Sequence, residues 1–392
     1  MKAASLLRRS WPARVTLIYL LSRLLSWGIM LWFAWVQGKS AYSGPHPDYV
    51  TFANFWDARW YNYIAAAGYP SALPIDASGH VLQNAWAFLP VYPFLVGGLA
   101  VMTHLLWSTV AIAVSLLAGW GFVMVLYRLM QPRLTAAQST WAVIFACVAP
   151  VAPIFGVAYA EALFLFLLAL SLLLLIERHY LLLALVLPIL SLTRPGAIAF
   201  ALTIGGHWLI RWRDRVADPF PLRQRVGIAL LAVWSALLGV AWTVIAALVT
   251  GQLDAYMATE LAWRAAYIGY VELIPGTAWF QSANWWYGQP WTWILPITAV
   301  IGFTALLFTP AAKRLGGEQR WWLGSYGLYL FAVFFPQSSS ARILAPMFSV
   351  SGILAQIRAS WIKVLIALLM IAGQFWWIAH TWMVSGLDWT PP

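Results

Sequence analysis

The sequence predicts an all-α protein that crosses a membrane about 11 times, and three observations support this prediction. Apolar residues make up 62% of the 392 residues, charged residues make up 9%, and the mean hydropathy is +0.77. Soluble domains carry roughly 25% charged residues. Apolar stretches of about 20 residues, long enough to span a bilayer as helices, recur along the chain. These features exclude a soluble enzyme and a disordered chain, and the single cysteine, Cys147, excludes a disulfide scaffold.

The charges of the loops orient the predicted spans. The formal net charge is +11, and most Lys and Arg residues fall in alternate loops. Because positively charged loops stay in the cytoplasm, these loops are predicted to be cytoplasmic, as is the N-terminus with Lys2, Arg8, Arg9 and Arg14. The C-terminus is then outside. The predicted spans are 15–36, 107–127, 140–157, 161–176, 180–193, 196–210, 227–250, 291–310, 321–335, 343–357 and 364–384.

One further apolar stretch, 85–106, is predicted to lie along the outer leaflet. If it crossed the membrane, every later loop would change sides and the most basic loop would be outside. Pro90 and Pro93 favour an irregular surface segment. Two long outer segments remain, 37–106 and 251–290. The whole chain, 1–392, is then predicted to form a single integral-membrane domain.

A short helix is predicted in the first outer segment. Asn54 is a plausible N-cap, which would place Asp57 at position N3, while Gly68 suits the C′ position and Pro70 prevents continuation. Four residues at spacings of four, three and four would share one face, suited to the lipid headgroups. They are Trp56, Trp60, Tyr63 and Ala67.

Asp57 is the candidate general base of this helix. A carboxylate near the N–H groups of a helix start stays ionised, and only an ionised carboxylate accepts a proton. A plain capping role for Asp57 is the alternative. For Arg59, the alternative to substrate binding is that its charge reaches the membrane interface while its stem stays in apolar surroundings.

Several segments resemble those of PIG-V-type mannosyltransferases. The resemblance covers most of the chain, and the first two segments are the more specific. They are Phe55-Trp56-Asp57 with Trp60-Tyr61, Ile64-Ala65 and Gly68-Tyr69; 87–93 (AFLPVYP); 158–164 (AYAEALF); 191–196 (SLTRPG); and 340–344 (SARIL). The family often has an aromatic residue after the late arginine, where this chain has Ile343.

The resemblance implies a bacterial member of a family that includes glycosylphosphatidylinositol mannosyltransferase II, within the C-type glycosyltransferase superfamily. Such proteins have a multi-span helical fold and an active site at the non-cytoplasmic face, and they take sugar from a polyprenyl-phosphate carrier. An acidic residue in the first outer loop acts as the catalytic base, and Asp57 is the matching residue here.

Transfer from a lipid phosphate needs a base, cationic groups for the leaving phosphate, and a groove open to lipid. Arg342 and Arg194, at the outer ends of predicted spans, are candidates for binding the phosphate of the donor. For both arginines the alternative is pairing with Glu161 or extension of the charged group to the membrane interface, and Glu161 could itself accept a sugar hydroxyl. A single in-line displacement with inversion is expected. The residues expected to contact substrate are Arg59, Trp60, Tyr61, Glu161 and Tyr92.

No cofactor and no protein-bound metal are expected. His46, His80 and His104 have no recognised ligand spacing, and neither a Walker A loop nor a G-x-G-x-x-G motif is present. A lipid-linked donor is therefore favoured over a nucleotide sugar, and no nucleic acid is expected as a partner. The aromatic segment 263–286 is a candidate acceptor lid, or else an interfacial loop.

The predicted function is mannosyl transfer to a lipid or glycolipid hydroxyl in the bacterial cytoplasmic membrane, or in the endoplasmic reticulum membrane of a eukaryote. Three alternatives stay open: a transporter or flippase of lipid-linked sugars, the same enzyme class with another sugar or a protein acceptor, and an inactive scaffold subunit. Transporters usually carry charged or broken helices at mid-membrane. Most acidic residues here fall near the outer face, which favours the enzyme.

Overall fold

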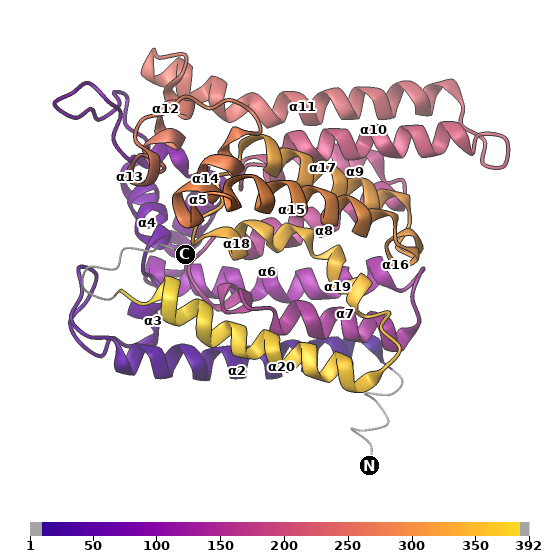
Figure 1. The fold of residues 1–392 in the computed structure, drawn as a ribbon, viewed down its shortest axis with the longest axis horizontal. Helices are drawn as coiled ribbons and strands as arrows, with labels where there is room; N and C mark the ends of the chain where they lie inside the picture. The colour runs from indigo at the N-terminus through magenta and orange to yellow at the C-terminus, as the bar shows by residue number, and fades with distance from the viewer. Residues whose placement is uncertain (1–9, 385–391) are drawn as a thin grey trace. The chain divides into compact units, whose positions relative to one another are not determined.

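A computed structural model of the chain describes residues 10–384 and 392. The regular secondary structure of this part is helical, with no β-strand (Figure 1). An isolated β-bridge joins Ile75 and Val81. Lys2, Arg8 and Arg9, on which the predicted orientation partly depends, lie outside the described residues. The chain divides into two compact units, each built from separate stretches of sequence. The prediction of one domain stays a prediction.

The first unit comprises residues 1–62, 92–173 and 338–392. Its helices begin with the long α2 and end with α20. They are α2 (Trp11–Val36), α3 (Tyr49–Phe52), the start of α4 (Asp57–Ala67), α5 (Val91–Thr103), α6 (Trp107–Met130), α7 (Ala136–Val148), η2 (Ala152–Gly156), α8 (Glu161–Ile176), α18 (Ser340–Leu344), η3 (Ala345–Met347), α19 (Ser349–Leu354), α20 (Ser360–Trp377) and η4 (Ile378–Trp382).

The second unit comprises residues 63–91 and 174–337. The longest of its helices, α11, pairs with α10. Its elements are η1 (Ala85–Ala87), α9 (Tyr180–Ser191), α10 (Ala197–Arg213), α11 (Leu222–Thr250), α12 (Ala255–Ala262), α13 (Ala265–Ile268), α14 (Thr277–Tyr287), α15 (Trp291–Phe308), α16 (Pro310–Arg314) and α17 (Gly317–Val333).

Among the described residues, five helices are long and apolar enough to cross a membrane: Trp11–Val36, Trp107–Met130, Leu222–Thr250, Trp291–Phe308 and Ser360–Trp382. Shorter apolar helices accompany them, among them α5, α7, α8 and α9. Most of the outward side chains of these helices are apolar, as lipid requires. The chain is thus a polytopic, all-helical membrane protein, which confirms the fold class predicted from its sequence.

Two predicted spans are interrupted. The stretch 140–157 was expected to be one helix, but α7 ends at Val148 and the turn η2 follows, because Pro150 and Pro153 cannot continue a helix. The stretch 343–357 is likewise divided among α18, η3 and α19 around Pro346. A proline within the first turn of a new segment explains each break.

Arg23 satisfies the carbonyl groups that the first break leaves without helical partners. It lies in the middle of α2, is 7% exposed, and donates hydrogen bonds to the carbonyl oxygens of Cys147 (2.8 Å) and Ala152. Its guanidinium also lies over the rings of Tyr19 and Phe155. A charge inside a span is costly unless it meets such groups. Arg23 therefore holds the region between α7 and α8 against α2.

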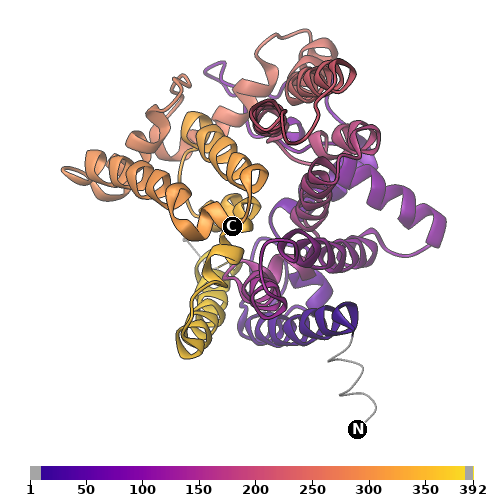
Figure 2. The same ribbon diagram turned by 90° about the vertical axis from the view of Figure 1, so that its right-hand side faces the viewer.

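In the second unit, α10 and α11 run side by side (Figures 1 and 2). Gly239 of α11 allows the close approach, because a Cβ at this position would lie 2.8 Å from the backbone nitrogen of Ile198. The outer segment before α5 packs on α11 and α12: Trp242 donates to the Trp86 carbonyl (3.0 Å) and Asn84 to Thr259 Oγ1 (2.9 Å). The two long outer segments predicted from the sequence thus meet within this unit.

Replacing Gly239 by Ala is expected to destabilise the protein by about 1–3 kcal/mol, since the backbone of α10 cannot move aside as a flexible side chain would. The readout is the apparent Tm of the detergent-purified protein. Gly227→Ala is the matched control in the same helix, because a Cβ there meets no atom within 4 Å. An equal Tm for the two variants would contradict the close packing at Gly239.

Candidate functional site

The helix that carries Asp57 begins later than predicted. α4 starts at Asp57 itself, so Asp57 is its first residue, and Asn54 is not its cap. Asn54 instead donates its side-chain amide to the carbonyl of Val50 (2.8 Å). Trp56 has a φ of +57°, a left-handed backbone conformation that stops the helix from extending toward Asn54. Gly68, with a φ of +73°, follows the last helical residue as expected.

The unusual backbone of Trp56 is held by contacts far along the sequence. The indole of Trp56 donates to the carbonyl of Trp382 (2.7 Å), and the indole of Trp382 donates to the carbonyl of Phe52 (3.0 Å). Trp56 is 5% exposed, so it does not lie on a headgroup-facing stripe. The buried residues of this helix are Ala58, Tyr61 and Ile64. The predicted stripe was therefore wrong at its first member.

Asp57, Glu161 and Arg342 form a buried ion cluster within the first unit. Nη1 of Arg342 donates to Asp57 Oδ2 and lies 3.0 Å from Glu161 Oε1. The exposed fraction of the side chain is 13% for Asp57, 3% for Glu161 and 10% for Arg342. Asp57 and Glu161 are the first residues of α4 and α8, and Arg342 lies in the short α18. Three segments remote in sequence thus bring two carboxylates to one guanidinium.

Both helix starts suit a negative charge. The first N–H groups of a helix have no partners within the helix, and they carry a partial positive charge. Burial by itself lowers the pKa of Arg342, but the charges of Asp57 and Glu161 outweigh burial and raise that pKa above its usual range. Arg342 therefore stays charged at neutral pH.

Tyr159 contacts two members of the ion cluster, Asp57 and Arg342. Its hydroxyl oxygen accepts the backbone N–H of Asp57 (3.1 Å), and its ring lies under the Arg342 guanidinium at 5.3 Å. Burial, followed by the charge of Asp57, raises the pKa of Tyr159 well above its usual value, so the phenol stays neutral. The 158–164 motif contained Tyr159, but the sequence reasoning assigned it no role.

Tyr61 and Tyr92, two residues predicted to contact substrate, pack behind Tyr159. Tyr92 is fully buried, and its hydroxyl meets the Ala111 carbonyl (3.0 Å) and Ser115 Oγ (3.1 Å). Ser115 donates in turn to the Tyr159 carbonyl (3.1 Å). The rings of Tyr61 and Tyr92 meet edge to face at 5.1 Å. These residues fix the position of Tyr159, and direct contact with substrate stays a prediction.

Arg59 and Trp60 lie on the first turn of α4, next to the cluster in sequence. Arg59 is exposed, and its guanidinium lies 4.7 Å above the ring of Tyr42. Trp60 is half-buried. Arg59 is thus exposed two residues from Asp57, and contact of Arg59 and Trp60 with substrate stays a prediction.

Arg194, the second predicted phosphate-binding residue, belongs to the second unit. It is half-buried between α9 and α10, and its charge acts on Tyr256, as does that of Glu260. Burial, then the Glu260 charge, raises the pKa of Tyr256 well above its usual value. The same unit holds the candidate lid: there the Tyr267 ring meets Trp285 at 5.1 Å and Phe335 at 5.8 Å. Roles for Arg194 and the lid stay predictions.

Across the described part of the chain, no three His, Cys, Asp or Glu residues gather closely enough to hold a metal ion. His46 binds the Trp35 carbonyl, and His80 stacks on Tyr270 at 4.0 Å. Whether the protein needs a metal or a cofactor stays a prediction from its sequence.

No protein-family model and no curated protein matches the chain. Solved structures of the oligosaccharyltransferase of the archaeon Archaeoglobus fulgidus are similar to it. The complex of this AglB protein with an inhibitory peptide and a dolichol-phosphate gives a TM-score of 0.45 at 12% identity over 98% of this chain. The apo form gives 0.44 at 13% identity over 93%. This chain spans 56% of the length of the oligosaccharyltransferase chain in each of these two structures.

Replacing Arg342 by Met is expected to cost about 3–5 kcal/mol of stability, because two buried carboxylates lose their counter-charge. The apparent Tm of the purified protein should fall by several degrees. Adding Glu161→Gln should restore part of the loss, since it removes one of the two charges.

Arg213→Met is the control for the loss of an arginine. Its ion pair with Asp214 has the same 3.0 Å separation but is exposed, and such pairs contribute about 0–1 kcal/mol. Equal Tm changes for Arg342→Met and Arg213→Met would show that the buried cluster does not stabilise the fold.

Proposed function

We propose that this protein is a membrane glycosyltransferase that transfers mannose from a polyprenyl-phosphate carrier to a hydroxyl of a lipid or glycolipid at the extracytoplasmic face. One observation above all supports the proposal. Asp57, the residue that the PIG-V resemblance marks as the base, lies in one buried cluster with Arg342 and Glu161 of two other motifs of that resemblance. Residues from three separate motifs converge in the first compact unit.

The proposed reaction is a single displacement. The Asp57 carboxylate takes the proton of the acceptor hydroxyl as the hydroxyl oxygen forms a bond to the anomeric carbon of mannose. The bond from that carbon to the phosphate oxygen breaks, and polyprenyl phosphate leaves with the bonding electrons. The configuration at the anomeric carbon inverts, and no covalent intermediate with the enzyme forms.

Arg342 is proposed to link the base to the leaving group. Nη1 of Arg342 contacts the two carboxylates. The buried Nε of Arg342 has no hydrogen-bond partner among the described residues. An orphaned buried N–H is costly, and a phosphate oxygen would satisfy it. Binding of the donor phosphate would thereby complete the hydrogen bonding of Arg342.

Glu161 is proposed to position Arg342 rather than to act on substrate. It is the least exposed member of the cluster and accepts from the same nitrogen as Asp57. By sharing the guanidinium, Glu161 would hold Arg342 in place beside Asp57. Arg59, exposed in the same first turn of α4, would supply a second positive charge for the phosphate.

Asp57→Asn is expected to slow mannosyl transfer at least about a hundredfold, because asparagine keeps the size of the side chain but cannot take the proton. The assay uses purified protein, polyprenyl-phosphate-mannose and a panel of envelope lipids, with donor binding measured separately. Donor binding by the variant should change little.

Asp48→Asn is the matched control. Asp48 is another carboxylate of the segment 37–106, where it caps α3 by accepting the N–H of Thr51 (2.7 Å), and asparagine caps equally well. Near-full activity of Asp57→Asn would remove Asp57 as the base. If the wild type transferred sugar neither from polyprenyl-phosphate-mannose nor from other lipid-linked sugars, this result would reject the proposed enzymatic activity and favour a transporter.

A further inference from the structure

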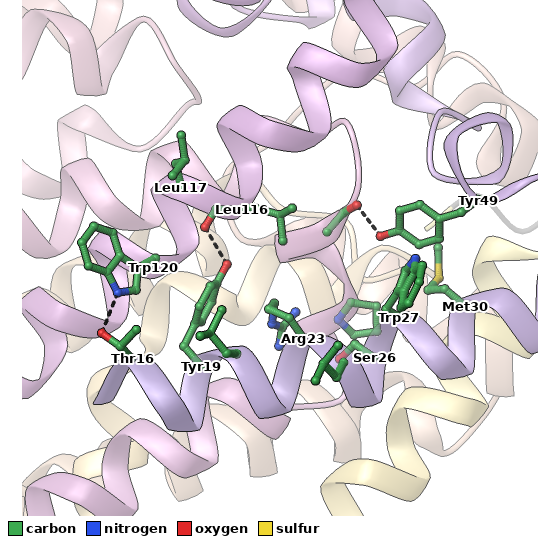
Figure 3. Close-up of a pocket in the computed structure, with 14 residues that line it drawn as sticks. Thr16, Tyr19, Arg23, Ser26, Trp27, Met30, Tyr49, Leu116, Leu117 and Trp120 are labelled. Carbon is green, nitrogen blue, oxygen red and sulfur yellow. Dashed lines mark hydrogen bonds between the residues drawn. The ribbon is translucent and has the colours of Figure 1, made fainter. Parts of the chain in front are cut away.

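A pocket of about 640 Å³ lies in the first unit among α2, α6, α3 and η2, apart from the ion cluster (Figure 3). Its lining is mostly aromatic and aliphatic. The apolar side chains of the lining include Leu20, Leu24, Trp27, Leu117 and Trp120. Its size falls in the range of about 300–1,000 Å³ that is typical of small-molecule sites.

The polar side chains at this pocket already form hydrogen bonds with other protein groups. The Tyr19 hydroxyl donates to the Leu116 carbonyl (2.7 Å), the Tyr49 hydroxyl to the Gly156 carbonyl (2.6 Å), and the Trp120 indole to Thr16 Oγ1 (3.0 Å) (Figure 3). Arg23 donates to backbone carbonyls and to Ser22, as described above. The surface left to an occupant is therefore hydrocarbon, which a polar or charged ligand would bind poorly.

The pocket is continuous with the lipid-facing surface of two spans. Leu20, Leu24 and Leu117, which line it, are 53%, 60% and 67% exposed. They lie on α2 and α6, both long enough to cross the membrane. Since the surroundings of these helices are lipid chains and not water, the molecule with access to the pocket is a lipid.

We propose that this pocket binds one fatty acyl chain of a membrane glycerolipid. Its lining extends along α2 from Thr16 to Met30, a rise of about 21 Å at 1.5 Å per residue. The acyl chains of one leaflet fill about half of a hydrocarbon core about 30 Å thick, or about 15 Å, so one chain fits within the length of the pocket. A polyprenyl chain is longer than one leaflet and would extend past both ends.

The occupied pocket would stiffen the backbone that leads to the ion cluster. Tyr49 and Gly156 at one end of the pocket are hydrogen-bonded, and Ala158 donates its N–H to the Ala53 carbonyl (3.1 Å). Tyr159 and Glu161 follow directly. The inference concerns a lipid site separate from the catalytic cluster, and it does not depend on the proposed function.

Photolabelling tests the proposal. The full chain is placed in lipid nanodiscs containing a trace of phosphatidylglycerol with a diazirine on its acyl chain, and labelled peptides are mapped. We expect label on the peptides of residues 16–30 and 116–120. Leu20→Trp, which fills the pocket, should reduce this label about tenfold, because a close-packed site does not admit both groups.

Leu21→Trp is the matched control, since Leu21 is 56% exposed on the same helix but does not line the pocket. Equal labelling of the two variants would overturn the proposal, because it would mean that lipid only surrounds the helix. Stronger labelling by a polyprenyl diazirine than by the acyl probe would overturn it too.

Leu24→Trp and native mass spectrometry provide a second route if Leu20→Trp folds poorly. The wild type and Leu21→Trp should retain one phospholipid after detergent extraction, and Leu24→Trp should lose it. Retention of the phospholipid by Leu24→Trp, or its absence from the wild type, would count against an acyl-chain site.

Discussion

The guanidinium of Arg342 is the group on which the arrangement of the candidate site depends. A buried charge is costly unless hydrogen-bonding groups or an opposite charge meet it, and Arg342 has two carboxylates. Because these begin α4 and α8, the ion pairs hold the starts of two helices together. Tyr159, between the backbone of Asp57 and the face of Arg342, joins the same assembly.

The interruptions of the helices place the charged residues. Lipid allows non-helical backbone only where protein satisfies its polar groups. The break between α7 and α8 meets this condition through Arg23, and it lies just before Tyr159 and Glu161. The break between α17 and α18 lies just before Arg342. An uninterrupted helix through either stretch would carry these side chains on a regular spiral and not toward Asp57.

Local sequence was sufficient to predict the long helices and the end of α4. Apolar length predicted α2, α6, α11, α15 and α20, and Gly68 predicted where α4 stops. The start of α4 could not be predicted, because the backbone of Trp56 is set by Trp382, 326 residues away. The pairing of Asp57 with Arg342 spans 285 residues. Family motifs named both residues, but no local pattern indicates that they touch.

The two carboxylates of the cluster differ in a way that separates their proposed roles. A general base must reach the hydroxyl of a substrate, and the side chain of Asp57 is 13% exposed against 3% for Glu161. Asp57 also begins a helix next to the exposed Arg59, whereas Glu161 begins the apolar α8, within which an acceptor would find no polar partner. In the proposed reaction, Glu161 therefore acts by positioning Arg342. In the proposed reaction, the more exposed Asp57 is the carboxylate that takes the proton from the acceptor.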